Sequence, residues 1–393
     1  GDRSSKVDGG GIFNRNGYVE LNATSNIIKT AKVAAIISMN ANSMAYQTQD
    51  RYENLVKLSA EGGNNEVISE ECTALALSSD NVGTKYTKVV LEAQKGNNIL
   101  KGYSTNNFDN SNWQAIEIED GILTVTATAN NTDEATGINE IWAGKVTTVN
   151  NLKTGNYDAL KISGSENNDA VSNATFTADN ANKFYGSIYA QNKSVVDIAA
   201  KNNAISSRKS NYAELSYGYA VVADGNNLTD DERTQINITA NGGANTIFST
   251  TGIIKDERTV FATEGGVVNI KGTSIITADG WLKANESGYQ ANSTSQALIA
   301  GTHDWGNTTP NFDVADEERS EINLIYGNGS AITGDIAAGY AGAINIIDQS
   351  SGSGAVGIST MAEGQDTSAA GNSLTIMGNA LAANGGKINL ELG

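Results

Sequence analysis

The residues best suited to bind a ligand lie between Gly301 and Glu321. This segment reads GTHDWGNTTPNFDVADEERSE and holds the only histidine of the chain, His303, together with Trp305 and Phe312. Aromatic rings on a loop favour contact with sugar rings or with another protein. The segment therefore predicts a binding loop that uses these three side chains. The alternative is that Trp305 folds the loop back onto its own scaffold.

Acidic residues recur in short tags that precede apolar runs. The tags read DDERT from Asp230, DERT from Asp256 and DEERS from Asp316. Because Ca²⁺ prefers oxygen ligands, one interpretation is a calcium site formed by Asp230, Asp231, Asp313 and Asp316. The other is a solvated loop in which the arginine of the tag pairs with a carboxylate. No EF-hand loop or tandem Gly/Asp nonapeptide accompanies the tags, and no other cofactor is expected.

Tyrosines gather between Lys183 and Val221. Tyrosine supplies contact area at a low cost in conformational entropy, so Tyr212, Tyr217 and Tyr219 are candidates for a binding patch. Tyrosine is also common in strands, which leaves a purely structural role open.

Catalysis is not expected. A serine hydrolase needs a nucleophile, a base and an orienting group, and His303 is the only imidazole. Glycosidases use paired carboxylates, for which Asp197 and Glu214 are candidates, but no clustered Asp/His/Arg set surrounds them in the sequence. The prediction is a protein that is not an enzyme. The alternative is a polysaccharide-degrading lyase or glycosidase.

These segments interrupt a repeat that runs along the whole chain. Its unit is an apolar, a polar and a second apolar residue, followed by small residues and a Gly/Asn turn, as in YVELNATSN from Tyr18, VVLEAQKGNN from Val89 and VNIKGTS from Val268. Such units bury their apolar side chains only when they stack. The repeat predicts an all-β fold, a right-handed parallel β-helix of about 11–12 rungs with three short strands each. A β-sandwich is the alternative, but it needs longer strands and regular hairpins.

The repeat also predicts which residues face the interior. The first apolar position of each apolar-polar-apolar phrase gives the central-strand anchors, at residues 19, 56, 89, 123, 160, 196, 236, 268, 322, 344, 374 and 388. Period two turns Val268 inward and Asn269 outward, so Val268→Asp is expected to be severe and Asn269→Asp nearly silent. Residues 1–393 are expected to form a single β-helix, with insertions at one corner, of which 301–321 is the main one.

Asparagines cluster after the central strands. Their amides tolerate left-handed turns and can bond to one another when rungs stack. The clusters predict a structural ladder through Asn64, Asn97, Asn131, Asn168 and Asn203. The other interpretation is a row of metal or sugar ligands.

Charge and composition exclude some partners. The formal net charge is −18, with 44 acidic and 26 basic residues, so nucleic acid and anionic membrane are unfavourable partners. No apolar run is long enough for a transmembrane helix. Cys72 is the only cysteine, so no disulfide forms within the chain. The lack of cysteine pairs suits a protein that crosses a second membrane unfolded, and the alternative is that Cys72 is simply a buried small residue.

The rung blocks VFATEGGVVNIKG and LAANGGKINLELG, with the others quoted above, resemble the passenger region of a monomeric Gram-negative autotransporter adhesin of the type V secretion class. The resemblance covers nearly all of residues 9–393. It implies a signal peptide and a C-terminal outer-membrane barrel, neither of which is in this sequence. It also implies display outside the cell, at the bacterial surface, and a role in virulence. Further rungs are expected to follow Gly393.

The function expected from the repeat and the resemblance is a non-catalytic adhesin. It mediates attachment, biofilm formation or aggregation through loops on a β-helical scaffold. The expected partner is a protein or glycan of a host or bacterial surface, or a second copy of the chain. A purely structural stalk is the remaining alternative.

Overall fold

The computed structural model describes residues 11–15, 17–40, 54–79, 87–102, 114–164, 172–208, 218–225, 233–250, 257–280, 295–301, 319–349, 355–359, 372–383 and 385–391. Most of these residues lie in β-strands, and among them only residues 279–280 are helical. The chain divides into two compact units. Unit 1 comprises Gly1–Gly186 with Lys193–Ala200, and unit 2 comprises Ser187–Asn192 with Lys201–Gly393.

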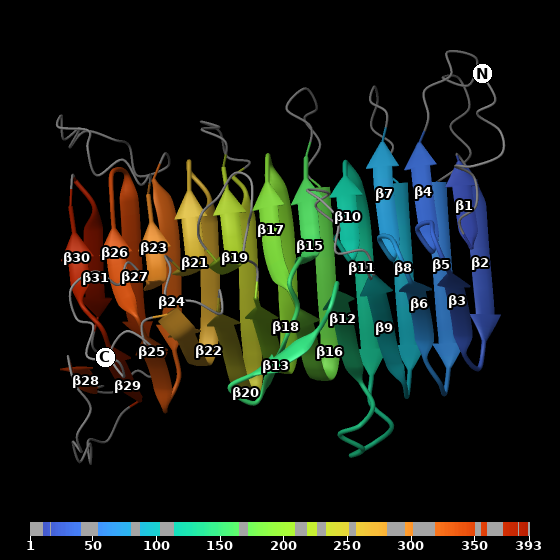
Figure 1. Cartoon of the computed structure of the whole chain (residues 1–393). Helices are drawn as coiled ribbons and strands as arrows, with labels where there is room; N and C mark the ends of the chain where they lie inside the picture. Colours follow the sequence, from blue (N-terminus) through green and yellow to red (C-terminus); the bar gives the residue numbers. More distant parts are fainter. Residues whose placement is uncertain are drawn as a thin grey trace. The chain divides into compact units, whose positions relative to one another are not determined.

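Unit 1 contains three stacks of parallel strands, and each rung contributes one strand to each stack (Figure 1). The first stack holds β1 (Ile12–Arg15), β4 (Ile36–Asn40), β7 (Leu75–Ser79), β10 (Ile116–Glu119) and β15 (Asp158–Ser163). The second stack holds β2 (Tyr18–Ala23), β5 (Asn54–Glu61), β8 (Thr87–Gln94), β11 (Gly121–Thr128) and the first half of β16 (Ser172–Tyr185). The third stack holds β3 (Asn26–Thr30), β6 (Asn65–Ser69), β9 (Asn97–Gly102), β12 (Ile138–Ala143) and the second half of β16.

Unit 2 repeats this arrangement. Its first stack holds β17 (Ser187–Gln191), β19 (Gly218–Asp224), β21 (Glu257–Thr263), β23 (Gln296–Ala300), β26 (Asp335–Ala338) and β30 (Ala380–Ala382). Its second stack holds the first parts of β20 (Gln235–Ser249) and β22 (Val267–Ala278), then β24 (Ser320–Tyr326), β27 (Gly342–Asp348) and β31 (Lys387–Glu391). The ends of β20 and β22 enter the third stack with β25 (Ser330–Thr333), β29 (Ser373–Met377) and β28 (Ala355–Ser359). Strand β18 (Ser194–Ser207) has residues in both units.

This topology confirms the predicted parallel β-helix. Every stack is parallel, three strands make a rung, and the described residues hold eleven first-stack strands, within the range expected from the repeat. In the later rungs the second and third strands merge into one long strand, as in β20 and β22.

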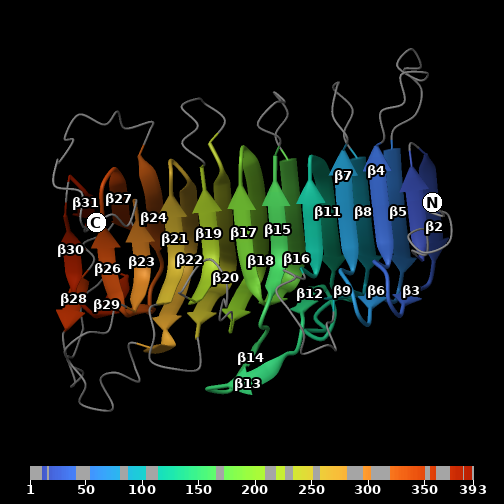
Figure 2. The ribbon, with the colours of Figure 1, turned by 45° about the horizontal axis from the view of Figure 1, so that its top comes forward.

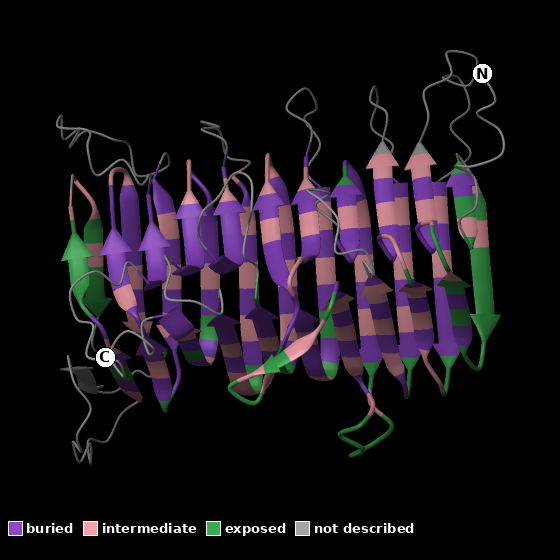
Figure 3. Ribbon diagram, in the orientation of Figure 1, coloured by how far each residue is buried: buried purple, intermediate pink, exposed green. Residues whose placement is uncertain are grey.

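The interior is filled by apolar residues that stack from rung to rung. Val56, Val89 and Leu123 lie opposite one another in β5, β8 and β11, and all three are fully buried. Burying each such side chain contributes about 1.5–3 kcal/mol. Small residues end the central strands where the corner is tight, as at Ala93 and Ala127. Figure 3 shows the alternation of buried and half-buried residues along the strands.

Two of the predicted central anchors belong to other stacks. Leu160 pairs with Ile116 in the first stack, and Leu374 pairs with Ser330 in the third. The phrase around Leu160 has the right composition, but a strand of the first stack also alternates apolar and polar residues. Composition alone does not distinguish the two.

The insertions are not confined to the one predicted corner, and residues 129–137 form a longer loop between second-stack β11 and third-stack β12. Residues 41–53, 80–86 and 302–318 connect first-stack to second-stack strands, as predicted. A second set connects third-stack to first-stack strands, and its described member is the antiparallel hairpin of β13 (Thr147–Val149) and β14 (Leu152–Thr154). Figure 2 shows this hairpin standing out from the stacked strands.

An inner asparagine ladder runs along the buried corner between the second and third stacks. In unit 1 each amide donates to the next, from Asn26 to Asn65, Asn98, Asn139 and Asn182, at Nδ2–Oδ1 distances of 2.8–2.9 Å. In unit 2 Asn203 donates to Asn245 at 2.9 Å. The second N–H of each donor reaches a main-chain carbonyl, as from Asn98 to Thr126 at 2.8 Å.

The ladder lies one residue later than the sequence suggested at two of its predicted members. Asn65 and Asn98 face inward, whereas the predicted Asn64 and Asn97 lie beside them. The oxygen of Asn64 accepts the main-chain N–H of Asn97 at 3.0 Å. Asn131 is also outside the ladder, because it occupies a left-handed turn with φ of 55° in a longer loop. The predicted member Asn203 belongs to the ladder, and Asn168 lies outside the described residues.

Candidate functional site

The most regular outward feature of the described residues is a row of asparagines on the second stack of unit 2. The apolar-Asn-apolar motif recurs in β20, β22, β24, β27 and β31, and strand alternation turns each asparagine away from the core. The register places them opposite one another. We call this row the outer asparagine ladder; it consists of Asn237, Asn269, Asn323, Asn345 and Asn389.

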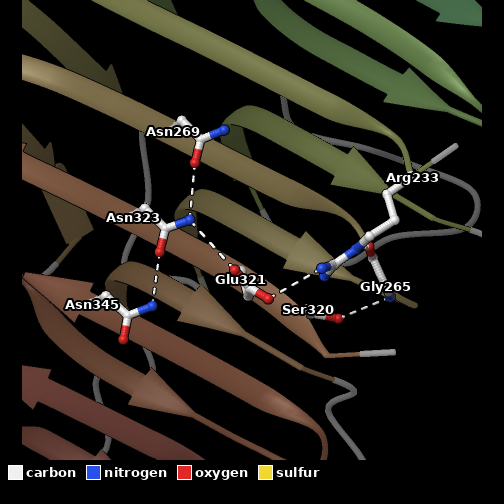
Figure 4. Close-up of polar contacts among 7 residues, drawn as sticks. All are labelled: Arg233, Gly265, Asn269, Ser320, Glu321, Asn323 and Asn345. Carbon is white, nitrogen blue, oxygen red and sulfur yellow. Dashed lines mark hydrogen bonds and ion pairs between the residues drawn. The ribbon is translucent and has the colours of Figure 1, made fainter. Parts of the chain in front are cut away.

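Each amide of the outer ladder donates to the one before it. The Nδ2–Oδ1 distances are 2.7 Å from Asn269 to Asn237, 2.9 Å from Asn323 to Asn269, 2.7 Å from Asn345 to Asn323 and 2.7 Å from Asn389 to Asn345. Figure 4 shows the three central members in line. The first four are half-buried and Asn389 is exposed, so solvent reaches the row.

The ladder is joined on one side to an ion pair that spans three rungs (Figure 4). Arg233 precedes β20, and its Nη1 lies 3.1 Å from the carboxylate of Glu321 on β24. Its Nε donates to the carbonyl of Gly265, in the rung between them, at 2.8 Å. Glu321 also accepts a longer contact from Asn323 at 3.4 Å. The Arg233 and Glu321 side chains are only 14% and 24% exposed, which protects the pair from solvent screening and fixes one edge of the ladder.

The chemistry available to the outer ladder is hydrogen bonding. An amide carries two N–H donors and two acceptor lone pairs. Asn345 uses one donor toward Asn323 and accepts from Asn389, so a second donor and a second lone pair can still bond to a ligand. Adjacent strands lie about 4.8 Å apart, and the row therefore offers donors and acceptors at a constant interval.

The acidic tags form structural contacts wherever they are described. In the tag at Asp256, the carboxylate of Glu257 is fully buried and accepts the N–H of Gly280 at 2.7 Å. In the tag at Asp316, Arg319 donates to the carbonyl of Gly385 at 3.3 Å. The described part of the chain holds no group of three or more His, Cys, Asp or Glu side chains placed to bind a metal.

Most predicted ligand-binding residues lie outside the described ranges. These are His303, Trp305 and Phe312 of the predicted loop, Tyr212 and Tyr217 of the predicted patch, and the predicted metal ligands Asp230, Asp231, Asp313 and Asp316.

Tyr219 does not form part of an exposed binding patch. It is only 2% exposed and packs with Val222, Phe261, Ile299 and Ala337. The outward positions of the first stack are apolar in unit 2, and the tyrosine ring is part of that apolar cluster. Tyrosine is common in strands, and Tyr219 has the structural role that this preference predicts.

The sequence alone does not reveal the outer ladder. The signal was present, because the same residue type recurs at one outward position in INI, VNI, INL, INI and INL. The apolar residues of those triplets indicate the interior, whereas each asparagine between them resembles an ordinary surface residue. Only the register shows that the five amides face one another.

The chain matches no protein-family model, no curated protein and no solved structure. Among the described residues, no helix is both long and apolar enough to cross a bilayer.

Proposed function

We propose that the chain is a non-catalytic adhesin, and that the outer asparagine ladder is the surface through which it attaches. The observation that carries this proposal is the repetition of one hydrogen-bonding side chain at the same outward position of five stacked strands. A row of this kind suits a ligand with its own repeated polar groups, such as a polysaccharide or an extended protein segment.

Pre-organisation supports an adhesive role. Each ladder amide is already held by its neighbours, so ligand binding orders fewer side chains than it would on an ordinary surface. One hydrogen bond contributes only about 0.5–1.5 kcal/mol net, but several bonds to one chain-like ligand act together. A repeated surface therefore converts weak contacts into stable attachment.

The proposal also includes a location, the outer surface of a bacterial cell. The resemblance to autotransporter passengers supports display at the outer surface of a Gram-negative cell. The net charge of −18 favours a neutral or basic partner surface over nucleic acid or anionic membrane.

Surface display on a non-adherent bacterium tests the proposal. Cells that carry the chain should attach to host or bacterial cells. Asn345→Arg should abolish attachment, because a long charged side chain then projects from the middle of the ladder. Thr124→Arg is the matched control, since Thr124 occupies the equivalent outward position of β11 in unit 1.

The outcomes separate the alternatives. Loss of attachment with Asn345→Arg alone supports the proposal, and unchanged attachment by a folded, displayed variant contradicts it. Clumping of the displaying cells without a second cell type would identify another copy of the chain as the partner. Release of reducing or unsaturated sugars from polysaccharides would contradict the proposal that the chain is not an enzyme. Attachment that survives removal of residues 302–318, which leaves Glu321 and β24 in place, would exclude the predicted loop as the binding element.

A further inference from the structure

The outer asparagine ladder presents the same hydrogen-bonding pattern at successive rungs (Figure 4). Asn269 and Asn345 each use one N–H for the preceding amide and accept one N–H from the following amide. An amide has two N–H donors and two acceptor lone pairs, so each of these residues keeps one donor and one lone pair for a ligand. A hydroxyl group is itself a donor and an acceptor, and it therefore matches this pattern.

The register holds the pattern at one interval. Each asparagine of the ladder is the direct partner of the next, from Asn237 on β20 to Asn389 on β31. Adjacent parallel strands lie about 4.8 Å apart, so the five members span about 19 Å. A ligand that bonds to the whole row must repeat its own polar groups at nearly the strand spacing.

An extended protein segment does not meet this condition. Its side chains on one face recur about every 6.6 Å, so a side chain aligned with one asparagine is about 2 Å out of step at the next and about 3 Å at the one after. Hydrogen bonds keep donor and acceptor within a range of about 2.7–3.2 Å. In a polysaccharide whose pyranose rings are joined through equatorial bonds, each ring advances the chain by nearly one strand spacing. Such a polymer stays in step with the ladder.

The residues beside the ladder suit a sugar ring. Ile325 and Ile347 are register partners on the outward side of β24 and β27, two residues beyond the ladder on each strand, and both are half-buried. Their accessible methyl groups form an apolar surface against which the C–H face of a pyranose can pack. The hydroxyl groups at the edge of the ring then lie toward the amides.

The charges on this face favour a neutral polymer. The outward positions of the five second-stack strands in unit 2 carry two lysines and two glutamates, Lys271, Lys387, Glu321 and Glu391. Arg233 adds one positive charge, which lies 3.1 Å from the carboxylate of Glu321. The face is therefore close to neutral, while the net charge of −18 on the whole chain opposes the approach of an acidic polysaccharide.

We propose that the outer asparagine ladder binds a neutral polysaccharide of equatorially linked hexopyranoses, which lies along the row with one ring at each rung. This inference names the ligand class of the site and rests on the proposed function, attachment through the same row.

Titration calorimetry of the full chain with cello-oligosaccharides of increasing length tests the spacing. Affinity should rise with each added glucose until the oligosaccharide covers the span of about 19 Å, at four or five rings, and should then level off. Dextran contains the same sugar but joins its rings through flexible exocyclic bonds. Dextran and an extended Ser/Thr peptide should each bind at least about tenfold more weakly than cellopentaose.

A swap of two neighbouring side chains tests the alignment without changing the composition of the face. Asn345→Ile combined with Ile347→Asn moves one amide by two residues, about 6.6 Å along the strand. The swap should weaken cellopentaose binding at least about tenfold, and the gain in affinity should end at the rung before the displaced amide. Thr124→Ile, at the equivalent outward position of β11 in unit 1, should leave the affinity unchanged.

The inference is overturned if affinity is independent of oligosaccharide length, if dextran or the peptide binds as tightly as cellopentaose, or if the swap variant binds like the unsubstituted chain. The length series needs no variant, so it decides the question even where the swap does not fold. Loss of cell attachment in Asn345→Arg without any binding of cello-oligosaccharides would overturn this inference alone. In-register binding of cello-oligosaccharides, with attachment unaffected by Asn345→Arg, would support it and contradict the proposed function.

Discussion

Replacing Asn269 by aspartate removes one donor from the middle of the outer ladder. Asn269 donates to Asn237 at 2.7 Å and accepts from Asn323 at 2.9 Å. A carboxylate keeps the second bond but faces the Asn237 oxygen with another acceptor. The expectation from the sequence alone was a nearly silent change, so the structure revises it.

The size of the effect follows from those two contacts. A half-buried hydrogen bond contributes about 0.5–1.5 kcal/mol, and the oxygen–oxygen contact adds repulsion, so Asn269→Asp should lower the free energy of unfolding by about 1–3 kcal/mol at pH 7. Only the protonated carboxyl can donate to Asn237, which raises the folded-state pKa of the introduced group above about 3.9. The loss in the free energy of unfolding is therefore complete above the folded-state pKa of the introduced carboxyl. It disappears as the pH falls below the unfolded-state pKa of that group.

This change in the free energy of unfolding is measured by urea unfolding, followed by the far-ultraviolet circular dichroism of the strands. The unfolding midpoint of Asn269→Asp should lie below that of the unsubstituted chain at pH 7 and should approach it at acid pH. The same substitution at the exposed ladder end, Asn389→Asp, should cost about 0–0.5 kcal/mol. An unchanged midpoint at pH 7, or a deficit independent of pH, would refute the role given to the ladder.

Three further predictions concern the scaffold. Val268→Asp buries a charge at a fully buried site and should cost about 4–7 kcal/mol, so a urea midpoint equal to that of Asn269→Asp would contradict the inward assignment. Gly96→Ala would place Cβ only 1.8 Å from the carbonyl oxygen of Gly63 in the preceding rung. The substitution should lower the free energy of unfolding by at least about 1–3 kcal/mol, measured by thermal or urea unfolding. A neutral result would show that the rungs are not this close. Burial, more than the nearby Glu117 charge, raises the pKa of the Cys72 thiol, so Cys72 should react with a maleimide more slowly than an unfolded cysteine at pH 7–8 and accelerate on unfolding; equal rates in the folded and unfolded chain would contradict its half-buried position.

The interior could be predicted from the sequence because burial acts on residue type. Val268 and Ile270 differ from Asn269 in polarity, and period two alone separates the inward from the outward positions. The register between strands could not be predicted in this way, because it depends on pairing between distant segments. The phrase around Leu160 and that around Val196 look alike, but they belong to different stacks.

The candidate sites depended on register more than on composition. Asn65 rather than Asn64 enters the inner ladder because alternation along β6 turns it inward. The outer ladder joins residues from several rungs. Motifs within one continuous segment therefore favour the aromatic loop around Trp305, because its candidate binding residues are close together in the sequence.

We propose that attachment uses the outer face of the second stack in unit 2. Hydroxyl-radical footprinting of the chain, free and bound to the surface that it adheres to, tests this directly through Ile325 and Ile347, which are half-buried and lie beside the ladder. Both should become protected on attachment, while Ile122, on the second stack of unit 1, keeps its reactivity. Unchanged reactivity of Ile325 and Ile347 in the bound chain would contradict the account.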